Sequence, residues 1–450
     1  MNSNLSKLGT LASTILISLK DFICSESCQE EYRTSKRYFS RKSLISFPNL
    51  VYLLLSTMSN SLSVELFNIL ESNKLCHFTK SAFSQRRYQL KHSVFEKMNQ
   101  LFVSLFYSNG KERLSYWHGF ILTAIDGSAF ILPKTPSTTG EFGTHGNGRK
   151  NKEQVHQTTM GRFVAQFDVL NHIITHSELQ PIAKNEQKIV YQWIPTLLEN
   201  SLTIFDRGFG SYLLFFLMQK YNKPFVIRLR VNFNEIVQEF VSSEQTDEIL
   251  MFINPTKRIW GEIVLKKGAE IPIRLIKIVL PNGTVEVLAT SLMSQVRFPH
   301  AVFSQLYHLR WGIETCFDRF KNKLLALCFL GHKAEAIYQE IYAAVVTHNI
   351  HQLLVIPAQI IVNEKIEKKK QEAVIYKFDQ KINDNVTIGI LKKDLFALFI
   401  SPNIEDKILF LIQNFAKFTE PIRPNRTNKR QKSIAKRRNL ITQTNFRRAG

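Results

Sequence analysis

The chain has 450 residues, which is long enough for two or three domains that each bury a core of their own. Hydrophobic residues make up 44% of it and charged residues 21%, a composition that excludes a disordered or fibrous protein. Lys and Arg number 59 against 37 Asp and Glu, so the formal net charge is +22. Such an excess is typical of a chain that binds a polyanion, most commonly nucleic acid.

The cysteine content and the hydropathy of the sequence indicate the cellular compartment. The five cysteines are odd in number and show no zinc-type pairing, which argues against a secreted disulfide scaffold. No apolar run reaches the 18 residues of a membrane span. We therefore expect a reduced, cytoplasmic protein without a membrane partner.

The first 115 residues have the apolar spacing of helices. Apolar residues recur at helical intervals in 47–55, 64–70 and 81–106. Basic residues cluster among them, namely Arg33, Lys36, Arg37, Arg41, Lys42, Arg86 and Arg87. A basic helical region of this kind is either a DNA-contacting domain or a solvated helical domain, and both interpretations stay open.

Residues 116–230 alternate between strand-like and helix-like segments. The expected strands are 120–125, 162–169, 172–179, 202–205 and 224–229, and the expected helices are 184–198 and 212–221. The polar stretch that ends at Met160 is expected to be a loop. This order predicts an α/β domain with a mixed sheet.

The second half of the chain, 231–450, changes character three times. Residues 231–292 are expected to be β-rich, with strands at 261–265, 271–280 and 284–290 and a hairpin turn at 281–283. Residues 293–360 carry two long helices, 302–325 and 334–354, and a helical region over 361–420 consists of a charged connection at 363–372 and a helix at 394–418. Residues 421–450 hold ten Lys or Arg and no Asp or Glu, which predicts a disordered tail attracted to phosphate.

Two aspartates end expected strands in similar contexts. Asp126 and Asp206 each follow an apolar run, and small residues come soon after each of them. A carboxylate at the end of a buried strand needs compensation, and a divalent cation can supply it. The alternative is that each Asp simply opens a turn.

A helical row supplies a third carboxylate. On a regular helix over 302–325, Tyr307, Arg310, Glu314 and Lys321 fall within about 60° of one another, beside an apolar stripe. The row is either a surface ladder of ion pairs or part of a catalytic site. Two Asp and one Glu would form an all-oxygen site suited to Mg²⁺ or Mn²⁺. Two such ions about 3.5 to 4 Å apart can act on a phosphodiester.

Several motifs together resemble one known family. The spacing Y-x2-R-x3-E-x6-K inside YHLRWGIETCFDRFKNKL resembles the Y-R-E-K signature of bacterial insertion-sequence transposases of the DDE class, in the insertion-sequence family four branch. Further matches, in order along residues 40 to 350, are SAFSQR at 81–86, IDGS at 125–128, FDRGF at 205–209 and ATSL at 289–292. The combination of the helical signature with both Asp blocks is far more specific than either block alone.

The resemblance implies a fold and a site. It implies an RNase H-like catalytic core with a β-rich insertion between Asp206 and Glu314, preceded by a helical N-terminal domain. Asp126, Asp206 and Glu314 would be the metal-binding catalytic triad for two Mg²⁺ or Mn²⁺ ions. Tyr307, Arg310 and Lys321 would contact the DNA backbone near the cleaved bond. In relatives an aromatic residue in the insertion supports a flipped base; Trp260 is a candidate here, although a role in packing is the preferred interpretation.

The resemblance also implies an activity and partners. The expected function is cut-and-paste transposition: hydrolytic nicking of the transposon ends and joining of the 3′-hydroxyl to target DNA. The partners would be the terminal inverted repeats and the target duplex, bound by a homodimer in a synaptic complex at the bacterial nucleoid. Two alternatives stay open, a catalytically inactive DNA-binding derivative and a metal-dependent nuclease of the same fold that does not join strands.

Overall fold

The computed structural model describes residues 2–56, 61–111, 114–146, 157–324, 326–372 and 376–423. The chain forms two compact units. The first consists of Met1–Arg113, Phe130–Gly161 and Asp318–Gly450, and the second of Leu114–Ala129 and Arg162–Phe317. All but the first three residues of the expected basic tail, 421–450, lie outside the described residues.

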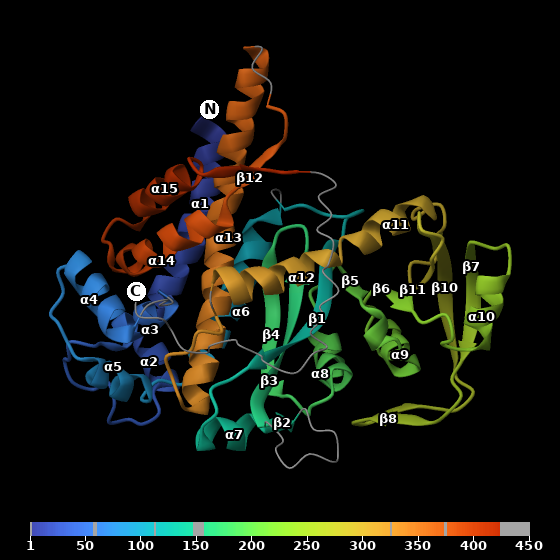
Figure 1. Cartoon of the computed structure of the whole chain (residues 1–450), viewed down its shortest axis with the longest axis horizontal. Helices are drawn as coiled ribbons and strands as arrows, with labels where there is room; N and C mark the ends of the chain where they lie inside the picture. The colour runs from blue at the N-terminus through green and yellow to red at the C-terminus, as the bar shows by residue number, and fades with distance from the viewer. Residues whose placement is uncertain are drawn as a thin grey trace. The chain divides into compact units, whose positions relative to one another are not determined.

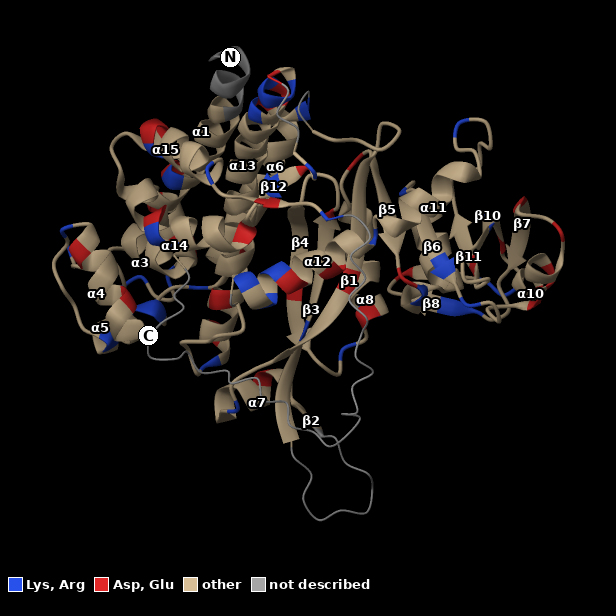
Figure 2. Ribbon diagram, turned by 45° about the horizontal axis from the view of Figure 1, so that its top comes forward, with Lys and Arg blue, Asp and Glu red and all other residues tan. Residues whose placement is uncertain are grey.

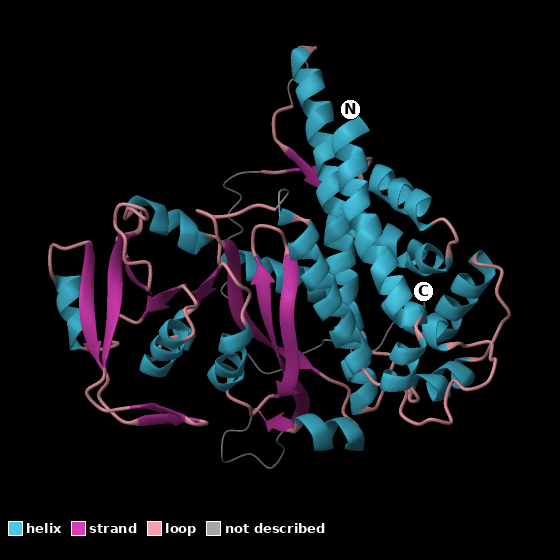
Figure 3. Ribbon diagram, turned by 180° about the vertical axis from the view of Figure 1, so that it is seen from behind, coloured by secondary structure: helices cyan, strands magenta, loops and turns pink. Residues whose placement is uncertain are grey.

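The first unit is a bundle around one long helix, α13 (Ala334–Gln371). The other helices are α1 (Asn2–Cys24), α2 (Glu26–Tyr32), α3 (Phe47–Leu55), α4 (Leu62–Ser72), α5 (Lys80–Arg87), α6 (Ser93–Asn109), α7 (Pro136–Phe142), α14 (Asp384–Ile400) and α15 (Ile404–Phe415). Helices α1, α3, α6 and α15 pack against α13, and both Figure 1 and Figure 3 show α1 running along it. The helical character expected for the N-terminal region is therefore confirmed.

Helix α13 is the core of this unit. Its length and composition would suit a membrane span, but 78% of its most apolar 18-residue window is buried inside the protein, as in the core helix of a folded domain. The expected charged connection at 363–372 is wrong, because α13 continues to Gln371. Lys and Glu are good helix formers, and pairs such as Lys370–Glu367 (2.7 Å) support the exposed end.

The last two helices also differ from expectation. The expected helix over 394–418 is two helices, and the first begins ten residues earlier, at Asp384. The side chain of Asn383 caps its start by accepting hydrogen bonds from two backbone N–H groups. Pro402 falls between α14 and α15, where it cannot continue a helix. The short strands β12 (Gln380–Ile382) and β13 (Thr419–Pro421) pair beside them.

The second unit is built on a mixed sheet, of which β2 and the adjoining ends of β1 and β3 belong by residue range to the first unit. The strands are β1 (Ile121–Ile131), β2 (Thr144–Gly146), β3 (Gln157–Asp168), β4 (Ile173–Pro181), β5 (Ser201–Phe205), β6 (Phe225–Leu229), β7 (Asp247–Ile253), β10 (Glu270–Val279) and β11 (Val285–Thr290). Their order is β2-β3-β1-β5-β6-β11-β10-β7, and β4 also pairs with β3. The central strands β1, β5 and β6 are parallel, whereas β11, β10 and β7 extend the sheet in antiparallel fashion.

Helices bury this sheet, which explains its continuous apolar strands. Every residue of β5 is buried. Helices α8 (Glu186–Trp193), α9 (Tyr212–Lys220) and α10 (Glu235–Ser242) form one cluster with Ile125, Phe205 and Ile227 from the central strands. Figure 3 shows these helices beside the strands of the sheet. Buried parallel strands with helical cover require such runs, and the arrangement is the RNase H-like mixed sheet that was expected.

The β-rich segment 231–292 joins this sheet. The expected hairpin is confirmed as β10 and β11, with Val279 opposite Val285. A separate pair, β8 (Arg258–Trp260) and β9 (Ile263–Leu265), lies near the expected strand at 261–265. Helix α10 and strand β7 were not predicted. The buried Arg274 of β10 fixes β7, since its Nε donates to Asp247 at 2.7 Å.

The continuous helix expected over 302–325 is wrong. It consists of α11 (Ala301–His308), α12 (Trp311–Asp318) and a π-helical turn, η4 (Arg319–Lys323). Between α11 and α12 the Arg310 N–H donates to the Tyr307 carbonyl, three residues back, which tightens the chain. In η4 the Leu324 N–H donates to the Arg319 carbonyl, five residues back, which widens it. A uniform helical angle therefore does not relate Lys321 to Arg310 and Glu314.

Candidate active site

The sheet aligns the two aspartates. Strands β1 and β5 are parallel, and the last residues paired are Ile125 and Phe205. Asp126 and Asp206 are the next residues of the two strands, so their backbones leave the paired region at the same edge of the sheet. Strand β1 continues past Asp126 to Ile131, which corrects the expectation that Asp126 ends its strand. The expected neighbourhood of the two aspartates is present in the fold.

Arg310 connects Asp126 to Glu314. Its Nη1 lies 3.7 Å from Oδ2 of Asp126, and its Nη2 donates to Oε1 of Glu314 at 2.9 Å. The Arg310 side chain is only 8% exposed, so a buried cation joins the two carboxylates. The tight turn before α12 places Arg310, and Gly312 lets this turn approach β3, because an added Cβ would lie 3.3 Å from Val169.

Asp206 has a different cationic partner. Nη2 of Arg228, from β6, lies 3.5 Å from Oδ1 of Asp206, and Nη1 of the same guanidinium donates to Glu286 of β11. The sequence did not single out Arg228. A charged residue inside the otherwise apolar strand FVIRL is the signal that could have found it, because burial of a charge requires a partner.

Tyr307 packs between these cations. Its hydroxyl donates to the carbonyl of Phe205 at 3.4 Å, and the guanidinium carbons of Arg228 and Arg310 each lie 5.9 Å from the ring centre. Burial raises the pKa of Tyr307, so the phenol stays protonated. The hydrogen bond fixes the residue that precedes Asp206. In this arrangement Tyr307 braces the site from within the protein.

Lys321 belongs to the first unit. It lies in the middle of η4, and its Nζ is 5.2 Å from the ring centre of Phe130. Burial lowers the pKa of Lys321. Of the six residues expected in the site, the fold brings five into one network within the second unit, and Lys321 is described separately.

Burial dominates the electrostatics of Asp126. It raises the pKa of Asp126, to about 6 as the net result; the Gly127 N–H and Arg310 lower that pKa, and the charges of Asp206 and Glu314 add weaker raising effects. A carboxylate whose ionisation is opposed in this way gains from a nearby cation. Figure 2 shows acidic residues, in red, on the segments labelled α8, β1 and α12.

A fourth carboxylate was missed by the sequence. Glu186 opens α8, and its Oε1 is buried without a hydrogen-bond partner, while its Oε2 lies 3.3 Å from Arg162. The same carboxylate occupies the space where a side chain at position 127 would lie, so any residue larger than Gly127 would have to displace the end of the Glu186 side chain. Burial, and then the charge of Asp126, raise the pKa of Glu186. Nothing in the sequence distinguishes it from an ordinary acid in the first turn of a helix.

The carboxylate oxygens of the site are ligands that a hard divalent cation prefers. Asp126, Asp206 and Glu314 offer only carboxylate oxygens, and the buried, unpartnered Oε1 of Glu186 adds to the uncompensated charge beside them. Within the described residues, however, no three His, Cys, Asp or Glu side chains lie within reach of one common ion. Arg310 stands between Asp126 and Glu314. To share an ion, the carboxylates would have to exchange Arg310 for the metal.

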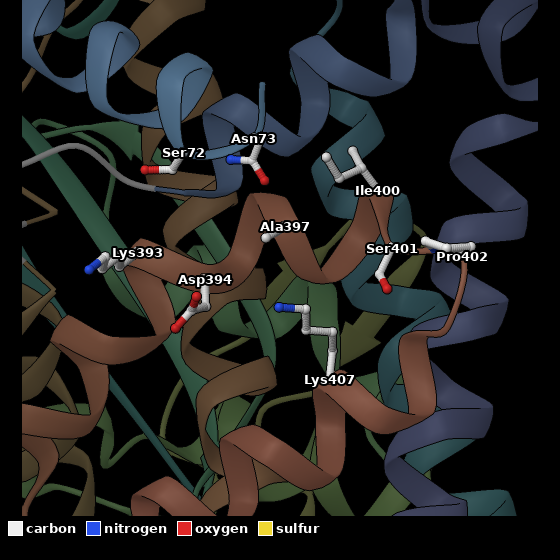
Figure 4. A pocket seen from close by; sticks show the side chains of 9 residues that line it. All are labelled: Ser72, Asn73, Lys393, Asp394, Ala397, Ile400, Ser401, Pro402 and Lys407. Carbon is white, nitrogen blue, oxygen red and sulfur yellow. The ribbon is translucent and has the colours of Figure 1, made fainter. Parts of the chain in front are cut away.

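A groove of about 360 Å³ lies elsewhere, in the first unit (Figure 4). It is lined by Ser72, Asn73, Lys393, Asp394, Ala397, Ile400, Ser401, Pro402 and Lys407. These residues come from the end of α4 and from α14, α15 and the turn between them. The groove contains none of the expected site residues.

Trp260 has a packing role. Its ring meets Tyr191 of α8 edge-on, with 5.3 Å between the ring centres, and it lies against the buried cluster of the second unit. This contact agrees with the preferred interpretation of Trp260 as a packed side chain.

Comparison with known proteins places the chain in a family. A family model described as "Transposase DDE domain" matches residues 117–350. Transposase InsG of insertion sequence element IS4 from Escherichia coli K12 is 25% identical over 242 residues, which cover 52% of each chain. Putative transposase InsZ from the same organism is 30% identical over 134 residues, which cover 29% of this chain and 43% of InsZ. This chain thus spans about half the length of the curated relatives it matches.

A solved structure is also similar. The piggyBac transposase synaptic complex with hairpin DNA overlaps 93% of this chain and 88% of its own, with a TM-score of 0.43 and 12% identity. Transposases of the DDE family generally use divalent metal ions. Because the family model matches more than half of the chain and encloses the network around Asp126, Asp206 and Glu314, this chain belongs to the family of transposases that carry a DDE domain.

Proposed function

We propose that this protein is a DNA transposase that cleaves the ends of an insertion sequence and joins them to target DNA. The observation that carries the proposal is the alignment of Asp126 and Asp206 at one edge of parallel strands, with Glu314 joined to Asp126 through Arg310. The net charge of +22 favours a polyanionic substrate. Membership of the DDE family supports the same reaction class.

In this proposal Asp126, Asp206 and Glu314 hold two Mg²⁺ or Mn²⁺ ions. Such ions, when bound, activate a water or a 3′-hydroxyl and stabilise the leaving oxygen of a phosphodiester. The protein supplies the positions of the carboxylates. β1 and β5 fix the two aspartates side by side, and the bond from Tyr307 to the Phe205 carbonyl secures the strand end before Asp206.

Arg310 would have a second role toward DNA. In the structure its guanidinium pairs with both Asp126 and Glu314. If these carboxylates held cations, the guanidinium would be available for a phosphate of the DNA, which its fork of N–H donors suits. Lys321 would hold a further phosphate as a point charge. Tyr307 would contact the same backbone near the cleaved bond only if its buried hydroxyl left the Phe205 carbonyl.

The partners follow from the reaction. The substrates would be duplex DNA of the terminal inverted repeats and a target duplex, and two ends must be held together, which requires a homodimer in a synaptic complex. The basic helical region 1–115 and the tail 421–450 would add contacts to phosphate. The protein would act at the nucleoid.

A strand-transfer assay tests the proposal. Pre-cleaved duplexes from both ends of the element that encodes the chain are incubated with the full-length protein, Mg²⁺ and a supercoiled plasmid. Joined products support transposition, and their loss in Asp206→Asn ties the reaction to the site. Cuts without joining would instead identify a nuclease, and binding without cuts in Mg²⁺ or Mn²⁺ would identify a DNA-binding derivative.

A further inference from the structure

The turn that carries Lys321 is unusual in shape and in charge. It is a π-helical turn, and Arg319, Lys321 and Lys323 place three cations within its five residues. A π-helical turn has poorer backbone geometry than an α-helix and often occurs at functional sites. Like charges this close repel one another. Something outside the turn must therefore hold it in place.

Asp384 of α14 holds the turn in place. Nε of Arg319 donates to Oδ2 of Asp384 at 2.9 Å, and Nζ of Lys323 donates to the same oxygen at 3.3 Å. Arg319 and Lys323 are the first and last residues of η4, so one carboxylate fixes both ends of the turn. The Asp384 side chain is only 10% exposed, and these ion pairs are therefore shielded from solvent.

A second residue of α14 contacts the end of the same turn. Nζ of Lys392 donates to the carbonyl of Leu324, the C-cap of η4, at 2.9 Å. Burial would raise the pKa of Asp384, but the charge of Arg319 and of its other neighbours outweighs burial and lowers that pKa to about 2. The carboxylate is thus ionised at any pH at which the protein would act on DNA.

Lys321 lies on the other side of the turn. It is two residues from both Arg319 and Lys323. A π-helical turn, with its i→i+5 hydrogen bond, has more than four residues per turn, so a spacing of two places Lys321 roughly opposite the side that Asp384 holds. Its ammonium lies over the ring of Phe130, which is fully buried and stacks on Phe320 of the same turn. Helix α14 therefore holds one side of the turn, and Lys321 lies on the opposite side.

We infer that Asp384 is a positioning residue for Lys321, which it holds in the orientation for contact with a DNA phosphate by fixing both ends of the π-helical turn. The inference rests on the proposed function, because it assigns the task of Lys321 from that proposal. The expected change in DNA affinity is opposite in sign to the usual one. Removal of a negative charge ordinarily strengthens DNA binding, whereas loss of Asp384 should weaken the binding of end DNA.

The test is a double-mutant cycle on the full-length protein. The affinity for duplex DNA from the element ends is measured over a range of salt concentrations for wild type, Asp384→Asn, Lys321→Ala and the double variant. Lys321→Ala should reduce the slope of log affinity against log salt by about 1. Asp384→Asn should weaken binding and reduce the slope in the same direction, and in the Lys321→Ala background it should change neither.

A matched control separates positioning from stability. Glu340→Gln breaks another buried ion pair of the same unit, Arg87 Nη1 to Glu340 Oε1 at 2.8 Å, and should lower the melting temperature without a change in slope. If Asp384→Asn does not fold, Asp384→Glu keeps the charge but displaces it by one methylene, and should give a smaller loss of the same sign.

The possible failures are distinguishable. Unchanged or tighter binding by Asp384→Asn, with a clear effect of Lys321→Ala, would overturn the inference and leave the proposed function intact. Additive losses in the double variant would also overturn it, since Asp384 would then act independently of Lys321. An unchanged slope in Lys321→Ala would overturn both the inference and the proposed role of Lys321.

Discussion

Replacement of Asp126 by Asn should remove a pH-dependent loss of stability. The pKa of Asp126 is raised by burial and by its acidic neighbours from an ordinary 3.8 to about 6, and its side chain is 26% exposed. A shift of about two pH units corresponds to about 2 to 3 kcal/mol. Below pH 4 the carboxyl is protonated in both the folded and the unfolded chain. Asp126 then does not lower the free energy of unfolding.

The sign follows from proton binding. Between about pH 4 and pH 6 the folded chain holds its proton on Asp126 while the unfolded chain has released it, so the free energy of unfolding falls as the pH rises. Above pH 6 Asp126 is ionised in both the folded and the unfolded chain, and the free energy of unfolding falls no further on its account. Asn cannot ionise, so the variant should gain about 2 to 3 kcal/mol relative to wild type between pH 4 and pH 7.5.

Urea unfolding in EDTA at pH 4 and pH 7.5 measures this difference. Groups that do not interact with Asp126 are common to both proteins and cancel in the comparison. The part of the raised pKa of Glu186 that comes from the charge of Asp126 is lost in the variant and changes stability in the same direction. Thr203→Val, which alters a buried residue of β5 that cannot ionise, serves as the control and should show no pH-dependent difference from wild type. Equal pH dependence of wild type and Asp126→Asn would refute the claim that desolvation raises the pKa of Asp126 despite its contact with Arg310.

Two further predictions concern the same network, and a third concerns the C-terminal segment. Asp206→Asn should abolish Mg²⁺-dependent cleavage of end DNA, measured on gels, while binding measured by fluorescence anisotropy stays near wild type; retained cleavage would remove Asp206 from the site. Gly127→Ala should destabilise the protein by only about 1 kcal/mol in thermal melts, because its Cβ displaces the flexible end of Glu186, and Glu186→Ala should relieve that loss; full additivity would argue against the contact. Deletion of residues 424–450 should reduce affinity for random duplex more than for end DNA, and the reverse result would make this segment a recognition element.

The sequence could predict the aspartates because buried apolar runs precede them. Apolar runs end at Asp126 and Asp206, and parallel pairing of β1 with β5 brings the ends together without any further information. The hairpin at 281–283 was predictable for a similar local reason, since Asn-Gly favours the turn. Local patterns of this kind depend on neighbours in the sequence.

Long-range contacts account for what could not be predicted. Glu186 looks like an ordinary acid at the start of a helix, and only the fold brings it against Gly127. The helix over 302–325 breaks at Arg310 and widens at Arg319, where ion pairs with α14 compensate the poorer backbone geometry. Because Asp384 is 65 residues from Arg319 along the chain, no helical periodicity could reveal that turn.

Titration of the purified full-length protein with Mn²⁺ by isothermal calorimetry tests the account most directly. If Asp126, Asp206 and Glu314 form one site, wild type should bind two ions per chain, and Asp126→Asn, Asp206→Asn and Glu314→Gln should each lose at least one, whereas Glu340→Gln should bind as wild type does. Identical stoichiometry and affinity in all five proteins would contradict the claim that these three carboxylates share metal ions.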